Sequence, residues 1–361
     1  MLPSFSNQLL AGCGLLLAGV AAAAQPKFLG MPIKAIDIHM HPGSYETIGP
    51  LGKAFVLEAL PPFIPAAVKE QILKTTSEQM LNPYGSMGIK KECEKAGLVA
   101  CGLFAVYAPA TWGVTSNEDV LGYLKDTRNA DENGKPYFFG LASVRMQNWD
   151  LRESFELDNL RQALKTPGMK GIKLAFIHNN IPLDDAQYDS VYEVAREFKV
   201  PVYHHVGSSP LRKLTDFPTL GEAEEYVSSY DPSRLERVLS AYPDVTFIMG
   251  HMGFDFNSEG YNFTPQVYEL ASRYPNVVLE ISAFGRSTYD KDGKAMDSVL
   301  SNIKAKGLIS RTIYGSDGPG APGGTEKYLE ATLASMNRVG YSFQEAEAVL
   351  SGNTRRVFRL D

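Results

Sequence analysis

The six histidines are the residues of this chain whose types and positions suggest chemistry. Each lies on a predicted strand or at its C-terminal end, and they are His39, His41, His178, His204, His205 and His251. In the predicted strand 34–41, Asp37, His39 and His41 alternate with apolar residues, so their side chains should share one face. Neutral imidazoles bind Zn²⁺ and other first-row divalent ions, and a catalytic site keeps one position open for water or substrate. His39 and His41 therefore predict part of a metal site, although this spacing also occurs by chance.

A carboxylate ends the last predicted strand, 311–317, where the sequence reads Gly-Ser-Asp-Gly-Pro from position 315. Asp317 could simply cap the next helix or satisfy the turn. In a closed barrel, however, the first and eighth strands are neighbours, which would bring Asp317 close to His39 and His41. That adjacency favours a functional role for Asp317.

Further histidines follow two other predicted strands. His204 and His205 are consecutive on strand 200–207, so only one of them can face the interior of a barrel. His251 lies at the end of strand 246–252, where a single histidine could also be a hydrogen-bonded core residue. Several such residues at the same ends of different strands indicate one common site.

Eight apolar runs alternate with amphipathic helical stretches, which is typical of a parallel sheet covered by helices. The runs span 34–41, 100–107, 137–144, 171–178, 200–207, 246–252, 277–284 and 311–317. Eight such units predict an α/β fold of the TIM-like (β/α)8 barrel type. Two connections are unusually long, 43–83 and 208–230, and both leave the C-terminal ends of strands. We therefore expect them to form a lid or a wall of the site.

The motifs, taken in order, resemble those of the amidohydrolase superfamily, and within it the amidohydrolase-2 branch that contains aminocarboxymuconate-semialdehyde decarboxylase. His-x-His at 39–41 is followed by Pro-Val-x-x-His-x-Gly at 201–207 and His-x-Gly at 251–253. Gly-Ser-Asp-x-Pro at 315–319 and Gly-Asn-x-x-Arg-x-Phe at 352–358 complete the series. The resemblance covers nearly the whole chain after residue 24, and it is the combination of motifs that is specific.

The resemblance implies a metal-dependent enzyme with one divalent ion, zinc by preference and manganese as the alternative. By position in the motifs, the metal ligands are His39, His41, His205 and Asp317. The same comparison makes His251 catalytic and gives Asp317 a catalytic role as well. The spacing of the fifth-strand motif selects His205, so His204 is expected to face the helices.

Other residues near predicted strand ends are candidates for the pocket. Lys173 occupies the strand on which binuclear members of the superfamily carry a bridging lysine. Because the branch resembled here is usually mononuclear, we expect Lys173 to be structural or to face the substrate. Trp112, Tyr107 and Arg286 are further candidates for the pocket wall.

Two reactions fit these residues. In hydrolysis of a lactone, ester or amide, the metal activates water, Asp317 accepts its proton and His251 orients the reactants. In non-oxidative decarboxylation, the metal holds a carboxylate of an aromatic or unsaturated acid, and Asp317 or His251 protonates the carbon that loses carbon dioxide. The strand-one motif favours the decarboxylase, and an export signal favours the hydrolase, which is our expectation. A non-catalytic barrel and a metal-free lactonase are further alternatives.

The first 24 residues are predicted to be a signal peptide. An apolar run over 9–20 precedes an Ala-x-Ala site at 22–24, and the run is too short for a membrane span. The absence of Lys and Arg from 1–8 is unusual, and lipidation at Cys13 is the alternative. We therefore expect one barrel domain over 25–361, exported to the periplasm or secreted.

Two cysteines remain after the leader, and a net charge of −6 limits the partners. Cys93 and Cys101 could form a disulfide in an oxidising compartment, but we expect two buried free thiols. The acidic balance and the lack of a Lys/Arg cluster argue against a nucleic-acid partner. We expect a small-molecule substrate and no membrane span, with a homodimer as one possible assembly.

Overall fold

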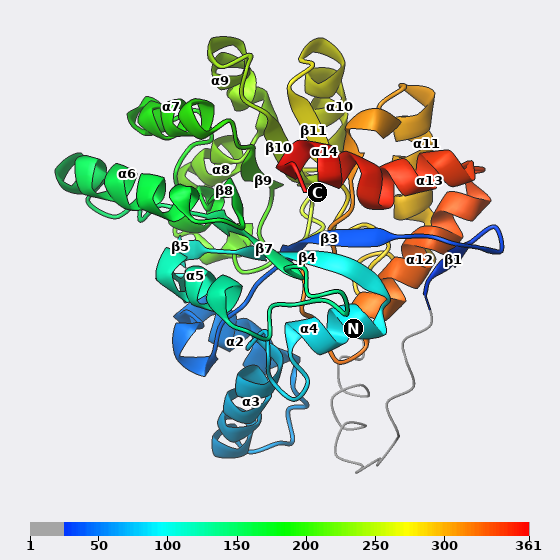
Figure 1. Cartoon of the computed structure of the whole chain (residues 1–361). Helices are drawn as coiled ribbons and strands as arrows, with labels where there is room; N and C mark the ends of the chain where they lie inside the picture. Colours follow the sequence, from blue (N-terminus) through cyan, green and yellow to red (C-terminus); the bar gives the residue numbers. More distant parts are fainter. Residues whose placement is uncertain (1–24, 361) are drawn as a thin grey trace.

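The computed structural model describes residues 25–360 and contains one eight-stranded parallel sheet. The strands follow one another in chain order around the sheet (Figure 1). They are β3 (Ala35–Met40), β4 (Leu98–Phe104), β7 (Phe138–Ala142), β8 (Met169–Leu174), β9 (Val202–Gly207), β10 (Phe247–Phe254), β11 (Val277–Glu280) and β12 (Thr312–Ile313). Each overlaps one of the eight predicted runs, so the predicted strand series is confirmed.

Hydrogen bonds between β3 and the segment after β12 close the sheet into a barrel. The amide of Ile38 donates to the carbonyl oxygen of Tyr314 at 3.2 Å. Further along the seam, the amide of Gly318 donates to the carbonyl oxygen of His39 at 2.9 Å. The amide of His41 donates to the carbonyl oxygen of Gly318 at 2.6 Å. The predicted (β/α)8 barrel is therefore confirmed, and His39, His41 and Asp317 lie along its closing seam.

One feature of β3 departs from simple alternation. Asp37 lies opposite Cys101 and Met40 lies opposite Leu103, so β3 advances three residues while β4 advances two. This bulge turns His39 and His41 toward the barrel axis but leaves Asp37 on the outer side, with Cys101. The prediction that Asp37 shares a face with the two histidines was therefore wrong, because period-two alternation fails across a bulge.

Helices cover the outside of the barrel, one after each strand (Figure 1). They are α4 (Ile89–Lys95), α5 (Asn117–Lys125), α6 (Trp149–Lys165), α7 (Asp189–Phe198), α9 (Glu236–Ala241), α10 (Thr264–Arg273), α11 (Lys294–Ala305) and α12 (Gly324–Arg338). Local signals start several of them: Ser116, for example, caps α5 in a capping box with Asp119. Short antiparallel pairs, β1 (Lys27–Phe28) with β2 (Met31–Pro32) and β5 (Val106–Ala108) with β6 (Gly113–Thr115), lie outside the barrel sheet.

The chain ends in α13 (Phe343–Glu347), a π-helical turn (Ala348–Gly352) and α14 (Asn353–Phe358), which pack against one end of the barrel. Phe358 joins the core inside the barrel and lies 5.1 Å from Phe139, ring centroid to centroid. The Asn353 amide donates to the carbonyls of Ile309 and Thr312 at 2.7 Å each. These contacts close the end of the barrel at which the strands begin.

Both long connections contain helices and lie over the opposite end. The first holds a 3-10 turn (Tyr45–Thr47), α2 (Pro50–Ala59) and α3 (Ala66–Met80). The second holds a 3-10 turn (Leu214–Asp216) and α8 (Leu220–Ser229). Side chains from both connections line the cavity at the C-terminal ends of the strands, as the sequence predicted.

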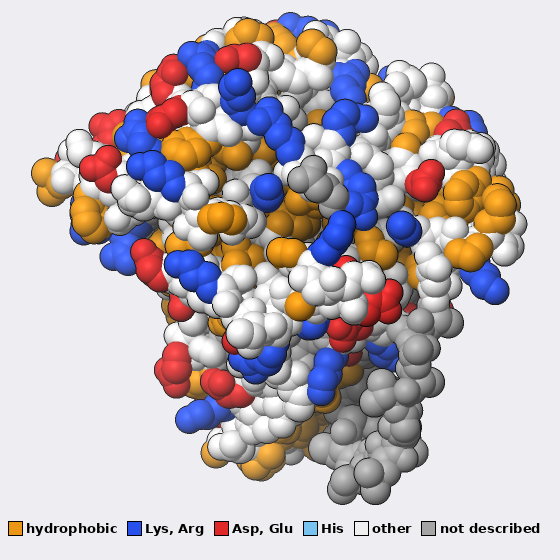
Figure 2. Space-filling model, viewed as in Figure 1, with side chains coloured by type: hydrophobic (Ala, Val, Ile, Leu, Met, Phe, Trp, Pro, Cys, Tyr) orange, Lys and Arg blue, Asp and Glu red, His pale blue; other side chains and the backbone are white. Residues whose placement is uncertain are grey.

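Basic side chains gather at the end where the strands begin. In the space-filling view, several Lys and Arg side chains lie around the place where Figure 1 marks the C-terminus (Figure 2). Six Lys and Arg side chains line a depression at this end, namely Lys34, Lys135, Lys170, Arg355, Arg356 and Arg359. This basic surface lies at the opposite end of the barrel from the histidines, so it is separate from the site described below.

Cys93 on α4 and Cys101 on β4 are joined as a disulfide, with their Cα atoms 7.1 Å apart. The expectation of two free thiols was therefore wrong: α4 packs directly on β4, which brings residues eight apart in sequence into contact. No helix within residues 25–360 is long and apolar enough to cross a membrane. The predicted signal peptide and Cys13 lie outside the described residues.

Gly250 leaves space for a buried tyrosine that the site needs. A Cβ atom on Gly250 would lie 2.0 Å from the hydroxyl of Tyr203. We predict that Gly250→Ala lowers the free energy of unfolding by about 1–3 kcal/mol, because the overpacked side chains must shift. Urea denaturation would measure this change.

Gly122→Ala is the matched control, since Gly122 is helical with nothing near its Cβ position, and it should raise stability by about 0.4–1 kcal/mol. Equal effects of the two substitutions would contradict the packing argument.

Candidate metal centre and active site

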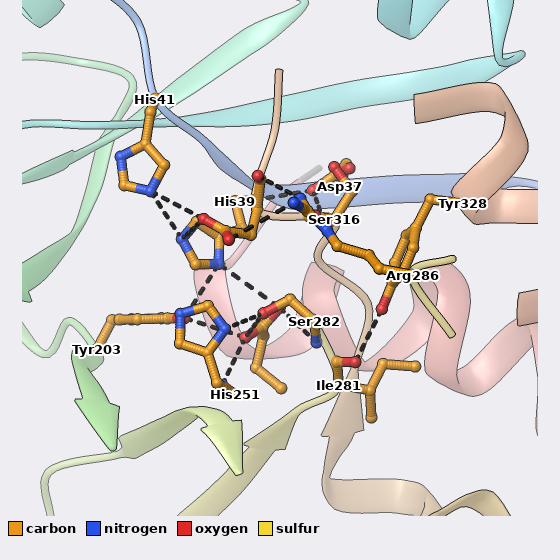
Figure 3. A network of polar contacts seen from close by, with 12 residues as sticks. Asp37, His39, His41, Tyr203, His251, Ile281, Ser282, Arg286, Ser316 and Tyr328 are labelled. Carbon is orange, nitrogen blue, oxygen red and sulfur yellow. Dashed lines mark hydrogen bonds and ion pairs between the residues drawn. The ribbon is translucent and has the colours of Figure 1, made fainter. Parts of the chain in front are cut away.

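Three side chains from the barrel seam converge at the C-terminal ends of the strands (Figure 3). The Nε2 atoms of His39 and His41 lie 3.0 Å apart. Oδ1 of Asp317 lies 3.3 Å from the first and 3.2 Å from the second. Ligand atoms bound tetrahedrally at ~2.0–2.1 Å from a zinc ion are roughly 3.3–3.4 Å from one another. The spacing of these three atoms therefore suits a small divalent cation.

The electrostatics of the three residues also suit a cation. Burial lowers the pKa of His39 well below its usual value, although Asp317 opposes this, so the imidazole is neutral at pH 7. Burial raises the pKa of Asp317, but His39, a hydrogen bond with His41 and Arg286 together hold it well below its usual range. A carboxylate thus faces two imidazole nitrogens, an arrangement that favours a positive charge between them.

His251 faces the same cavity from the end of β10. Its ring centroid lies 5.2 Å from that of His39 and 4.4 Å from that of His205. Burial, followed by the neighbouring His205, lowers the pKa of His251 well below its usual value. Both His251 (φ 60°) and Asp317 (φ 55°) have left-handed backbone conformations, which cost energy in residues with a Cβ and cluster at functional sites.

A buried glutamate beneath the histidines was missed by the sequence analysis. Glu280 ends β11 with a fully buried side chain, and its Oε1 lies 3.7 Å from Nδ1 of His39. Its Oε2 accepts hydrogen bonds from the hydroxyl of Tyr203 at 3.0 Å and from that of Ser282 at 2.7 Å. Burial raises the pKa of Glu280 to about 7 against these hydrogen bonds. The available signal was a charged residue inside an otherwise apolar strand.

The remaining histidines have different surroundings. His205 lines the cavity, but its Nε2 lies 2.8 Å from the carbonyl oxygen of Ser208, and it is not among the residues that converge with His39. His204 points outward to Tyr192 on α7, with Nε2 and the hydroxyl 3.3 Å apart, as predicted. His178 lines the cavity with its ring 5.2 Å from that of His205.

The cavity above these residues has a volume of about 280 Å³. Its far wall is apolar and comes mainly from α2 and α3, with Phe55, Val56, Leu60, Ile72, Leu73 and Met80. Trp112 and Arg286 line it, as the sequence suggested. Tyr107 does not: its hydroxyl accepts from the amide of Asn117 behind the cavity. Arg286 contacts the carbonyl oxygens of Ser316 and Asp317, which holds its guanidinium beside the Asp317 carboxylate.

Lys173 is a second basic side chain, after Arg286, in the lining of the cavity. Its side chain is buried, with Nζ 4.1 Å from the ring centroid of Tyr203 and 5.4 Å from that of Phe104. Burial lowers the pKa of Lys173 to about 7, although Asp317 and Glu280 oppose the shift. Of the two expected roles for Lys173, structural or facing the substrate, its place in the cavity lining fits the second.

The position of Lys173 has a consequence for stability. In metal-free protein, the folded state disfavours the ammonium form, so stability should rise with pH between about 7 and 10.5. We predict that Lys173→Met is more stable than the parent by ~3 kcal/mol or more below pH 7, and that this difference shrinks as the pH approaches 10. Denaturant melts at several pH values would measure this difference in stability.

Lys327→Met, at an exposed position on α12, is the control and should change stability by less than about 0.5 kcal/mol at every pH. A pH-independent difference for Lys173→Met would contradict the prediction.

Comparison with known structures supports the fold at low sequence identity. An uncharacterized TIM-barrel protein from Bordetella bronchiseptica is 18% identical, with a TM-score of 0.60 over 91% of this chain and 99% of that one. A probable 2-pyrone-4,6-dicarboxylic acid hydrolase from Acinetobacter baumannii is 15% identical, with a TM-score of 0.55 over 91% and 100%. A 5-carboxyvanillate decarboxylase from Novosphingobium aromaticivorans, complexed with manganese, is 16% identical, with a TM-score of 0.55 over 91% and 96%. No curated protein sequence matches.

A family model described as Amidohydrolase matches residues 130–360. The matched region includes β8 to β12 and α14, and with them His205, His251 and Asp317. Similar solved structures include a probable hydrolase and a decarboxylase, so this fold occurs with both reactions. Because the match extends over more than half of its length, this chain belongs to the amidohydrolase family.

Proposed function

We propose that this chain is a metal-dependent hydrolase that cleaves a lactone, ester or amide of a small substrate. His39, His41 and Asp317 would hold one divalent ion, zinc by preference with manganese as the alternative. His205 is the fourth candidate ligand, once its Nε2 no longer donates to the carbonyl of Ser208. When bound, such an ion supplies positive charge that acidifies water and polarises a carbonyl group.

Hydrolysis is favoured by the two proton acceptors that line the cavity, the Asp317 carboxylate and the His251 imidazole. Asp317 is held ionised and His251 neutral at pH 7, because the pKa of each is well below its ordinary value. Both groups are therefore ready to accept a proton, and neither stores one. Hydrolysis begins when a base takes a proton from water, whereas decarboxylation ends when an acid gives a proton to carbon. The site matches the first requirement better.

In this reaction Asp317 would accept a proton from water while the water oxygen bonds to the carbonyl carbon. The bond from that carbon to the leaving oxygen or nitrogen then breaks, and the proton held by Asp317 passes to the leaving atom. His251, with Nε2 toward the cavity, would orient the water or the carbonyl group. Arg286 and Lys173 would attract a carboxylate of the substrate, and the apolar wall from α2 and α3 would cover its hydrocarbon part.

Decarboxylation of a small aromatic or unsaturated acid is the second candidate. Lys173 favours it, because a lysine with a pKa of about 7 could both attract the substrate carboxylate and supply a proton to carbon. One similar structure is named as a hydrolase of 2-pyrone-4,6-dicarboxylic acid and another as a decarboxylase complexed with manganese, so each candidate has a counterpart with this fold.

Product mass separates the two reactions. We predict that protein loaded with zinc converts carboxylated lactones, esters or amides to products heavier by one water, and leaves aromatic carboxylic acids unchanged. His251→Asn should lower kcat by about 10²–10⁴-fold, because a group that handles or orients the transferred proton is lost. His204→Gln, which alters a histidine outside the cavity, is the matched control and should retain activity. Loss of carbon dioxide from the acids would overturn the hydrolase proposal in favour of the decarboxylase.

Metal content tests the proposed ligands independently of any substrate. We predict about one equivalent of divalent metal per chain in protein purified without chelators, measured by elemental analysis. His39→Gln should lose this metal, because it removes one of the three converging donor atoms, whereas His204→Gln should retain it. Metal-free protein with full activity would contradict the ligand assignment, and two equivalents would add Lys173 to the ligand set.

Export to the periplasm or secretion, by contrast, depends on residues 1–24, which lie outside the described part of the chain, and stays a prediction. A homodimer likewise stays a prediction.

A further inference from the structure

One buried carboxylate connects the two histidines that the proposed function needs, His39 and His251. On one side, Nδ1 of His39 lies 3.0 Å from the hydroxyl of Tyr203, and that hydroxyl lies 3.0 Å from Oε2 of Glu280. On the other, Nδ1 of His251 lies 2.7 Å from the hydroxyl of Ser282, which lies 2.7 Å from the same Oε2 (Figure 3). Two imidazoles from different strands thus reach one carboxylate oxygen, each through one hydroxyl.

The directions of these hydrogen bonds follow from the donors around Glu280. The backbone amide of His251 donates to Oε2 at 3.1 Å and that of Ser282 donates to Oε1 at 3.1 Å, so both oxygens act as acceptors. When Glu280 is ionised, the hydroxyls of Tyr203 and Ser282 each donate their single proton to Oε2. Each hydroxyl oxygen can then only accept from the imidazole beside it.

The consequence is a fixed tautomer for both rings. Nδ1 of His39 and of His251 must carry the proton, which leaves Nε2 of each with its lone pair directed to the cavity. For His39, that is the atom that converges with His41 and Asp317. In the usual arrangement, one acceptor orients one metal-binding histidine.

The packing around Glu280 is specific to this arrangement. A Cβ on Gly315 would lie 2.2 Å from Oε1 of Glu280, and a Cβ on Gly250 would lie 2.0 Å from the hydroxyl of Tyr203. Glu280, Tyr203 and Ser282 are buried, so water cannot substitute for these partners. Gly250 on β10 and Gly315 just after β12, one on each side of β11, therefore leave room for the carboxylate and one of its hydroxyl partners.

We propose that Glu280 is a positioning residue for both halves of the site: through Tyr203 it sets the metal-binding tautomer of His39, and through Ser282 it sets the proton-accepting tautomer of His251. The proposal deepens the proposed function, since it assigns metal binding and proton transfer to separate branches of one network. The two branches can be cut separately, because each contains one hydroxyl.

Tyr203→Phe removes only the branch to His39. We expect it to weaken the affinity of the metal-free protein for Zn²⁺ by about 10–100-fold, measured by competition with a chelating dye. Tyr314→Phe is the matched control, because the Tyr314 hydroxyl is also buried but has no hydrogen-bond partner within residues 25–360. The control should bind Zn²⁺ like the parent protein. Parent-like affinity in Tyr203→Phe would overturn this branch.

Ser282→Ala removes only the branch to His251. It should leave Zn²⁺ affinity within about twofold of the parent and, where turnover is measurable, lower kcat about tenfold or more with little change in KM. Ser143→Ala is its control, since the buried Ser143 hydroxyl has no partner within residues 25–360. A loss of Zn²⁺ affinity equal to that of Tyr203→Phe would overturn the separation of the branches. Glu280→Gln should combine both losses, because its amide donates toward hydroxyls that must donate to it.

Histidine tautomers provide a readout that needs neither metal nor substrate. In ¹⁵N-histidine-labelled, metal-free protein, nitrogen chemical shifts should report Nδ1–H tautomers for His39 and His251. Tyr203→Phe should alter the signal of His39 alone, and Ser282→Ala that of His251 alone. Nε2–H tautomers in the parent protein would overturn the proposal. If the tautomers are as expected and no substrate is hydrolysed, the proposed function fails while the assignment of Glu280 stands.

Discussion

The structure depends on holding two imidazoles and a carboxylate close together at the C-terminal ends of the barrel strands. Nε2 of His39, Nε2 of His41 and Oδ1 of Asp317 lie within 3.3 Å of one another, and the surrounding chain imposes these positions. It does so at the seam where β3 meets the segment after β12. The bulge in β3 turns His39 and His41 toward the barrel axis. The left-handed backbone at Asp317 directs its carboxylate to these two side chains.

The seam is stabilised from its outer side as well. Oδ1 of Asp37 accepts from the backbone amides of His39 at 2.9 Å and Ser316 at 3.0 Å, and so fastens the two segments that carry the converging residues. Burial raises the pKa of Asp37 to about 7 in spite of these hydrogen bonds. A second buried carboxylate, Glu280, accepts hydrogen bonds from the Tyr203 and Ser282 hydroxyls beneath the imidazoles. Neither acid lies among the three converging residues, yet each accepts a hydrogen bond from the backbone amide of a histidine at the site, Asp37 from His39 and Glu280 from His251.

The sequence could predict the barrel and most of the site, because both depend on periodic patterns. Apolar strands alternating with helices identify the fold, and strand ends identify the positions of His39, His41, His251 and Asp317. What could not be predicted depends on local irregularity or on contacts distant in sequence. The alternation of apolar and polar residues along a strand does not reveal a bulge, so the sequence analysis placed Asp37 on the wrong face of β3. The partners of Glu280 come from β9 and from the segment after β11, and nothing in the local sequence indicates that their hydroxyls meet at one oxygen.

Such a site costs stability, and the fold offsets that cost elsewhere. Left-handed conformations at two residues cost of order 1–3 kcal/mol each, and the buried groups of Lys173 and Glu280 add to this. The opposite end of the barrel is closed by packing and hydrogen bonds: Phe358 fills the interior beside Phe139, and Asn353 satisfies two backbone carbonyls. The barrel itself does not choose between the two proposed reactions, which differ in whether a group at the C-terminal ends of the strands must accept a proton or donate one.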